Sequence, residues 1–203
     1  DWIADCGVDF IVFPARCNLG TAYYPTRLGI PHPAMDGDLY GDLVAACHAK
    51  GIAISAYINV GLSHEESYRN RGWAVLNADG TSYREPFGSS FFRQMCYNTG
   101  YADHVTGMAR EVVEWYGVDG LFFDCFHTQP CIGIECMEKM KAEGIDFADS
   151  VQLNDFNYRK MLTMARKLSE GVRGIDPELL LYFNGIDYEA QAELGSYLEL
   201  ECL

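Results

Sequence analysis

The sequence predicts an α/β domain, and three observations favour this fold class. Short apolar runs at 10–16, 52–60, 118–124, 179–184 and 196–202 are separated by segments with helical periodicity. Such alternation is typical of a parallel sheet with helices packed on its faces. Polar residues on one face of the second and fifth runs favour a (β/α)8 TIM barrel over a doubly wound open sheet, whose strands are apolar on both faces. No glycine-rich phosphate loop follows any run, which argues against a nucleotide-binding sheet.

Length and composition fit a single folded domain. The chain has 203 residues, of which 49% are hydrophobic and 22% are charged, so a sizeable core can form. A complete barrel typically needs about 250 residues. We therefore expect residues 1–203 to form a single (β/α) barrel domain, truncated at both ends, with about five strands present.

Charge and hydropathy restrict the classes of partner. A net charge of −14 disfavours nucleic acid and anionic membrane surfaces. No apolar run approaches the roughly 20 residues that span a bilayer, so no membrane partner is expected. The sequence leaves the oligomeric state open.

The first strands and the first helix follow from simple patterns. Residues 10–16 form a short apolar strand, and Asp38 can cap a helix that continues to Gly51. The second strand alternates, with one face formed by Ile52, Ile54, Ala56, Ile58 and Val60 and the other by Ala53, Ser55, Tyr57 and Asn59. We expect the first face to pack on helices and the second, polar face to point inward.

The rest of the chain continues the alternation after a long segment at 61–100. Loops of this length are usually functional, and residues 73–83 are predicted to form a hairpin around Asp79 and Gly80. The later elements, in order, are a helix at 105–115, a strand at 118–124, a helix from about 150, a strand at 179–184, a short helix after 187 and a strand at 196–202.

Three carboxylates carry the predicted chemistry. Asp124 ends a buried strand, where a carboxylate is costly unless it is hydrogen bonded, paired or in use. Glu199 and Glu201 share the inward face of the last strand, and a pair of carboxylates flanking a bond is what glycoside hydrolysis requires. The structural alternatives are a helix cap for Asp124 and an ion pair with an arginine such as Arg16 for one of the glutamates.

The cysteines offer a second, weaker pattern. Cys125, Cys131 and Cys136 follow the third strand, and with Cys96 they could form a four-thiolate zinc site. Because no tight Cys-x-x-Cys knuckle is present, we expect no metal and no other cofactor. The eight cysteines are scattered, and several lie in strand or helix patterns, which favours a reducing, cytoplasmic location.

Several segments together resemble a known family. They are Tyr23-Tyr24-Pro25-Thr26, His32-Pro33, Asp38-Leu39 with Gly41, the segment 48–57, Trp73 with Asp79-Gly80, the segment 118–124 and the segment 197–201. This pattern resembles the family called hypothetical glycosyl hydrolase six, a set of glycosidase barrels similar to the alpha-L-fucosidases. The resemblance covers nearly the whole chain, and it implies a glycosidase barrel with a carbohydrate substrate.

The resemblance also implies a role for Asp124. Fucosidases carry their nucleophilic Asp after an aromatic pair at the end of the fourth barrel strand, and Phe-Phe-Asp at 122–124 is similar to that motif. The glycine that usually follows the nucleophile is replaced here by Cys125. Where fucosidases have a Lys followed by a His pair that grips the sugar, this chain has Ala-Arg-Cys-Asn at 15–18, so the sugar is left open.

The sequence therefore predicts a retaining glycoside hydrolase. Asp124 is the expected nucleophile, and Glu201, with Glu199 as second choice, is the expected acid and base. The residues expected to hold substrate hydroxyls are Arg16, Asn18, Tyr24, Tyr57, Asn59, His64, His127 and Asn184. One alternative is a carbohydrate-binding barrel without catalysis. Another is a metal-dependent sugar isomerase, which would need several inward Asp, Glu or His ligands on successive strands.

Overall fold

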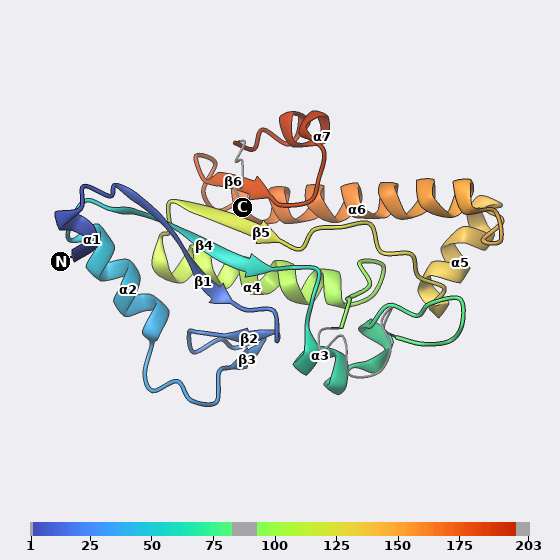
Figure 1. Ribbon diagram of the computed structural model, residues 1–203, viewed down its shortest axis with the longest axis horizontal. Helices are drawn as coiled ribbons and strands as arrows, with labels where there is room; N and C mark the ends of the chain where they lie inside the picture. Colours follow the sequence, from blue (N-terminus) through green and yellow to red (C-terminus); the bar gives the residue numbers. More distant parts are fainter. Residues whose placement is uncertain (1, 83–92, 198–203) are drawn as a thin grey trace.

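The computed structural model describes residues 2–82 and 93–197 (Figure 1). Its elements, in order, are α1 (Trp2–Asp5), β1 (Phe10–Arg16), β2 (Thr21–Ala22), β3 (Ile30–Pro31), α2 (Leu39–His48), β4 (Ala53–Asn59), α3 (His64–Arg69), η1 (Arg71–Trp73), α4 (Tyr101–Tyr116), β5 (Gly120–Asp124), α5 (Ile134–Glu143), α6 (Ser150–Arg173), β6 (Leu180–Phe183) and α7 (Tyr188–Glu193).

The strands of the described chain form one sheet of order β3-β2-β1-β4-β5-β6. The pairs β2·β3, β1·β4, β4·β5 and β5·β6 are parallel, and the β1·β2 pair is antiparallel. Strands β1, β4, β5 and β6 thus remain neighbours in chain order, with helices in each connection. A barrel grows in this way, whereas a doubly wound sheet reverses its strand order. The predicted α/β class is confirmed as a mixed fold with a mostly parallel sheet.

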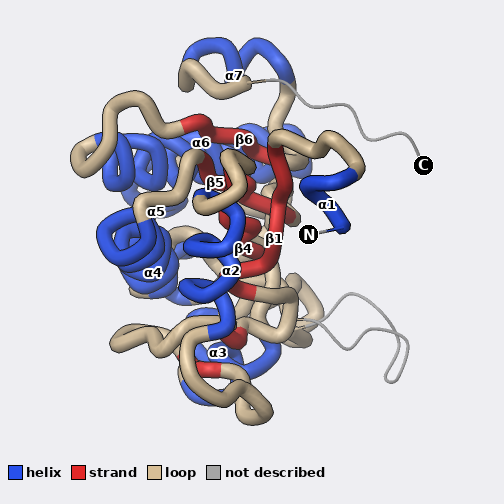
Figure 2. The backbone as a smooth tube through the Cα atoms, turned by 90° about the vertical axis from the view of Figure 1, so that its left-hand side faces the viewer, coloured by secondary structure: helices blue, strands red, loops and turns tan. Residues whose placement is uncertain are grey.

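Three helices cover one face of the sheet. Figure 2 shows α2, α4 and α5 on the same side of the strands. The alternation of β4 is confirmed, because Ile54 and Ile58 are buried in the core with Leu121 and Phe123 of β5. The other face has less cover, since Phe10 and Val12 of β1 are each 36% exposed.

Side-chain caps and one glycine set the helix ends as the sequence predicts. The Asp38 carboxylate accepts a hydrogen bond from the Gly41 amide at 2.9 Å, at the start of α2. Helix α4 ends at Gly117, whose φ of +56° lies in the left-handed region that glycine adopts at least cost. Asp187 caps α7 through the Ala190 amide at 2.9 Å.

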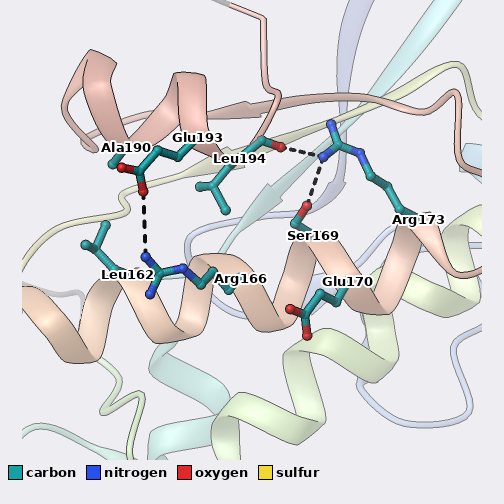
Figure 3. Close-up of a pocket in the computed structure, with 8 residues that line it drawn as sticks. All are labelled: Leu162, Arg166, Ser169, Glu170, Arg173, Ala190, Glu193 and Leu194. Atoms are coloured by element: carbon teal, nitrogen blue, oxygen red, sulfur yellow. Dashed lines mark hydrogen bonds and ion pairs between the residues drawn. The ribbon is translucent and has the colours of Figure 1, made fainter.

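Helix α7 is fixed on α6 by polar contacts around a hollow between them (Figure 3). The Arg173 guanidinium donates to the carbonyl oxygen of Leu194 and, at 3.2 Å, to the hydroxyl of Ser169. Arg166 lies 3.8 Å from the carboxylate of Glu193. Both arginines of α6 that line the hollow thus contact α7 or the residue that follows it, and these contacts join the two helices.

The predicted hairpin at 73–83 is wrong in its pairing. The turn forms, because the Asn77 amide donates to the Thr81 carbonyl at 2.8 Å, but Ala74 pairs with Met95 in an antiparallel bridge. Tyr83 lies outside the described residues. The two-residue strands β2 and β3 and the helix α5 were not predicted, because they are too short or too weakly periodic to give a signal.

Tyr197, from the predicted fifth strand, lies beside β6. The Tyr197 amide donates to the Leu181 carbonyl at 3.0 Å, and the Tyr197 ring stacks on Tyr182 with 5.5 Å between centroids. The rest of this segment, 198–203, lies outside the described residues. No helix in 2–82 or 93–197 is both long and apolar enough to cross a membrane.

Candidate active site

Polar side chains gather where the parallel strands end. The register pairs Asn59 of β4 with Asp124 of β5, and in the row below it pairs Tyr57 with Phe122 and Phe122 with Tyr182. The lower row is aromatic, with ring centroids 5.7 Å apart for Tyr57 and Phe122 and 4.7 Å apart for Phe122 and Tyr182. Asn59 and Asp124 therefore lie next to a row of aromatic rings at the carboxyl edge of the sheet, where the active sites of barrels form.

Asp124 is held by donors on both carboxylate oxygens. Its Oδ1 accepts a hydrogen bond from Asn184 Nδ2 at 2.9 Å, and its Oδ2 accepts from the Tyr57 hydroxyl and, at 3.4 Å, from the Cys125 thiol. The side chain is half-buried. Burial and the hydrogen bond to Asp124 raise the pKa of Tyr57 above its ordinary value, so this phenol stays a donor at neutral pH.

Two asparagines extend the network. Asn59 is fully buried, and its Nδ2 lies 2.9 Å from Asn18 Oδ1 and 3.1 Å from the Tyr57 oxygen. Its Oδ1 accepts from the Leu62 amide at 2.9 Å, which fixes the orientation of the amide group. Tyr57 has one proton, and a charged carboxylate is the stronger acceptor. We therefore assign that proton to Asp124, while Asn59 satisfies the oxygen of Asn18.

The loop after Asp124 is in a strained conformation. Cys125 has a φ of +55°, in the left-handed region. A side chain at Gly61 would collide with the Cys125 carbonyl, so the chain segments that follow β4 and β5 approach closely here. The resemblance implied a glycine at position 125, and this backbone conformation gives the physical reason for that preference.

Replacing Cys125 by glycine is expected to stabilise the protein by up to about 1 kcal/mol. The left-handed conformation costs a residue with a side chain about 1 to 2 kcal/mol, and glycine would remove this cost. The greater freedom of glycine in the unfolded chain offsets about 0.5 to 1 kcal/mol of the stabilisation. Urea unfolding would measure the change in the free energy of unfolding. Cys125→Ala is the matched control, since it removes the thiol and keeps the strain. An alanine variant as stable as the glycine variant would contradict the explanation.

Arg16 lies beneath the polar row, in a buried ion cluster. It is 1% exposed, and its Nη2 lies 2.5 Å from Glu66 Oε2 while its Nη1 donates to the Asn59 carbonyl. Glu66 Oε1 lies 2.6 Å from His104 Nε2. Burial alone would raise the pKa of Glu66, but the charge of Arg16 and the bond to His104 outweigh it and lower that pKa to about 2. Arg16 thus has a buried glutamate partner, from α3, and supports the end of β4.

The other predicted binding residues fall in different places. Tyr24 is fully buried, and its hydroxyl lies 3.2 Å from both the Met108 carbonyl and the Glu111 carboxylate of α4. His64 begins α3 and lines a hollow with Tyr68.

His127 is near the polar row. It is exposed, and a Cβ on Gly185, the neighbour of Asn184, would lie 2.6 Å from its Nδ1. The structure therefore brings together Asn18, Tyr57, Asn59, Asp124 and Asn184, with His127 beside them. Glu199 and Glu201 lie outside the described residues.

Sequence reasoning missed Glu66. The spacing of Ser63 and Glu66 is typical of a capping box, in which the glutamate side chain returns to the start of its own helix. The Ser63 hydroxyl does accept from the Glu66 amide at 3.2 Å, but the carboxylate turns away to Arg16. No local pattern reveals a partner 50 positions away in the chain.

Of the four cysteines considered for a metal site, three come together. Cys125 is held at Asp124 and Asn59, where its Sγ lies 3.2 Å from Asn59 Nδ2. Cys96, Cys131 and Cys136 form a separate, buried group.

The mostly parallel sheet and the carboxylate at the end of β5 place the chain among the α/β domains with a candidate site at the strand ends, and comparisons identify its family. The model for hypothetical glycosyl hydrolase 6 matches residues 2–125, so the chain belongs to that family. A search of curated protein sequences finds no significant relative.

Three solved structures illustrate the similarity. Alpha-L-fucosidase isoenzyme 2 from Paenibacillus thiaminolyticus is 27% identical with a TM-score of 0.83, over 90% of this chain and 28% of that one. A hypothetical protein from Ruminiclostridium thermocellum is 14% identical with a TM-score of 0.62, over 90% of this chain and 88% of that one. The PgaB (BpsB) glycoside hydrolase domain from Bordetella bronchiseptica is 16% identical with a TM-score of 0.64, over 86% of this chain and 54% of that one. The last two similarities show a shared fold. The chain spans just over a quarter of the fucosidase's length.

Proposed function

We propose that this protein is a retaining glycoside hydrolase in which Asp124 is the nucleophile. The observation that carries the proposal is a half-buried carboxylate at the carboxyl end of β5, held by Asn184 and Tyr57 in a chain of a glycoside hydrolase family. A nucleophile must meet the anomeric carbon along one line of approach, and donors on both oxygens fix its direction.

The reaction has two steps. Asp124 attacks the anomeric carbon, the bond from that carbon to the leaving oxygen breaks, and the acid donates its proton to that oxygen. The same acid residue, now a base, takes a proton from water, which attacks the anomeric carbon and releases Asp124. Glu201 is the proposed acid and base, with Glu199 second. Retention requires its carboxyl group to lie about 5 to 5.5 Å from that of Asp124, against about 6.5 to 9.5 Å for inversion.

The polar row supplies contacts for the sugar hydroxyls. With its oxygen engaged by Asn59, Asn18 presents its amide nitrogen as a donor that no described residue engages. Asn184 donates to the carboxylate from the β6 side, and His127 lies beside Gly185, the residue after Asn184. Arg16 and Tyr24 are left out of this set because both are buried with partners elsewhere. The predicted role of His64 in binding a substrate hydroxyl stays a prediction.

The test uses aryl glycosides of different sugars, beginning with an alpha-L-fucoside because of the similarity to the Paenibacillus enzyme. On the sugar that is hydrolysed, Glu201→Ala should lose activity on poor leaving groups and keep it on activated ones, which depart without a proton. Added azide should restore this variant and give a glycosyl azide with the configuration of the substrate. Glu199→Ala tests the second candidate for the acid in the same way. If neither variant depends on the leaving group, the proposed acid is wrong. If a sugar binds without turnover, the protein is a binding module.

A further inference from the structure

We infer that Cys96, Cys131 and Cys136 form a buried binding site for one thiophilic metal ion, of which Zn²⁺ is the representative. The inference is independent of the proposed glycosidase activity. The three sulfur atoms lie within 4.8 Å of one another, and those of Cys96 and Cys136 are 3.4 Å apart. Zinc–sulfur bonds of about 2.3 Å at tetrahedral angles place two thiolates about 3.8 Å apart. Small side-chain movements would bring the group to that geometry.

The groups around the sulfur atoms are donors. The amides of Leu76 and Gly133 point at Cys131 Sγ, at 3.4 and 3.3 Å, and Asn98 Nδ2 points at Cys136 Sγ at 3.3 Å. A thiol is a weak acceptor, so these donors suit thiolates better, and a thiolate is the form that binds metal. Gly133 leaves space beside this sulfur atom, because a Cβ on that residue would lie only 3.3 Å from Cys131 Sγ.

A buried cation lies beside the group. Lys160 of α6 is buried, interacts electrostatically with Cys96 and Cys136, and donates to the Gln129 carbonyl at 2.7 Å. Within the described residues no carboxylate forms an ion pair with it. A buried ammonium without a counter-charge is costly. Three thiolates and one divalent cation carry a net charge of −1, which would compensate Lys160.

The sequence spacing does not reveal this site because the ligands come from three segments. Cys96 precedes α4, Cys131 lies in the loop after β5, and Cys136 is in α5. The apolar side chains of Val75, Met140, Phe156 and their neighbours pack around the sulfur atoms. The fourth position of a tetrahedron would be completed by water. A bound ion would tie the loop that follows Asp124 to α5 and to the segment before α4.

The first test is titration of the reduced protein with Zn²⁺ against a chromogenic chelator. One ion should bind per chain, and Cys136→Ser should weaken binding by at least about 100-fold, because even groups that only orient ligands are typically worth 10- to 100-fold. Asn98→Ala should fall within that 10- to 100-fold range. Cys47→Ser is the matched control, since Cys47 is a buried cysteine of α2 outside the group, and it should bind as the parent does.

The second test needs no variant, which covers the case in which Cys136→Ser fails to fold. Zn²⁺ should protect Cys96, Cys131 and Cys136 from alkylation in partly denaturing urea, as mapped by mass spectrometry, while Cys47 stays unprotected. With Co²⁺ the protein should show thiolate-to-metal charge-transfer absorption in the near ultraviolet. A folded, reduced protein that binds no stoichiometric ion, or that binds one without protecting these thiols, would overturn the inference.

Discussion

Replacing Asp124 by asparagine is expected to lower turnover by on the order of 10⁴-fold or more, since losses of this size follow when a catalytic nucleophile is removed. The amide has the shape of the carboxylate and can still bond to Tyr57 and Asn184, so the fold should persist. It cannot attack the anomeric carbon. Hydrolysis of the preferred aryl glycoside measures the loss, and thermal unfolding checks the fold.

Asp119→Asn is the matched control for this variant. Asp119 immediately precedes β5, at the opposite end from Asp124, where it accepts from the Ile54 amide at 2.8 Å and lies 3.0 Å from His48 Nε2. Its replacement should leave turnover near that of the parent. Near-normal turnover of Asp124→Asn would remove Asp124 from the mechanism.

Replacing Glu66 by alanine is expected to lower the free energy of unfolding by about 3 to 5 kcal/mol, the usual effect of removing one partner from a buried ion pair. Arg16 would keep its charge with no carboxylate beside it, and His104 would lose the same partner. Urea unfolding at neutral pH gives the difference. Glu65→Ala is the control, since Glu65 is the adjacent, less buried residue of α3, and it should change stability by less than about 0.5 kcal/mol.

Acid should remove the same stabilisation from the parent protein. The pKa of Glu66 is lowered in the folded state from 4.5 to about 2, so its contribution is fully present above pH 4.5 and is lost as the pH falls through about 2. The contribution is on the order of 3 kcal/mol, from roughly two and a half pKa units. The stability difference between the parent and Glu66→Gln should therefore shrink between pH 4.5 and 2. A difference that stays constant over this range would show that the carboxylate is not held by Arg16.

The fold was predictable because its signals are local. The alternation in β4 and the helical stripe of α4 each reflect one buried face, and Asp38 and Gly117 mark helix ends through their own backbone chemistry. The hairpin failed for the opposite reason. The turn around Asp79 is local, but the partner of Ala74 is Met95, and a strand partner that distant leaves no local trace.

The candidate site was predictable where strand register decides it. Residues that end neighbouring parallel strands must meet at one edge, so Asn59 and Asp124 follow from the strand assignments. The choice of Arg16 for substrate binding rested on its place at a strand end. The sequence could not show that Glu66 of α3 forms an ion pair with Arg16. The thiol group is hidden in the same way, because its members meet only when α5 and the loop after β5 are in place.

Covalent trapping tests the central claim most directly. The protein would be incubated with a fluorinated analogue of the glycoside it hydrolyses, with a leaving group good enough that the glycosyl-enzyme forms faster than water breaks it down. Digestion and mass spectrometry would then locate the sugar. We predict one sugar per chain, esterified to Asp124, and no adduct in Asp124→Asn. An adduct on another carboxylate, or hydrolysis with inversion and no adduct, would contradict the account.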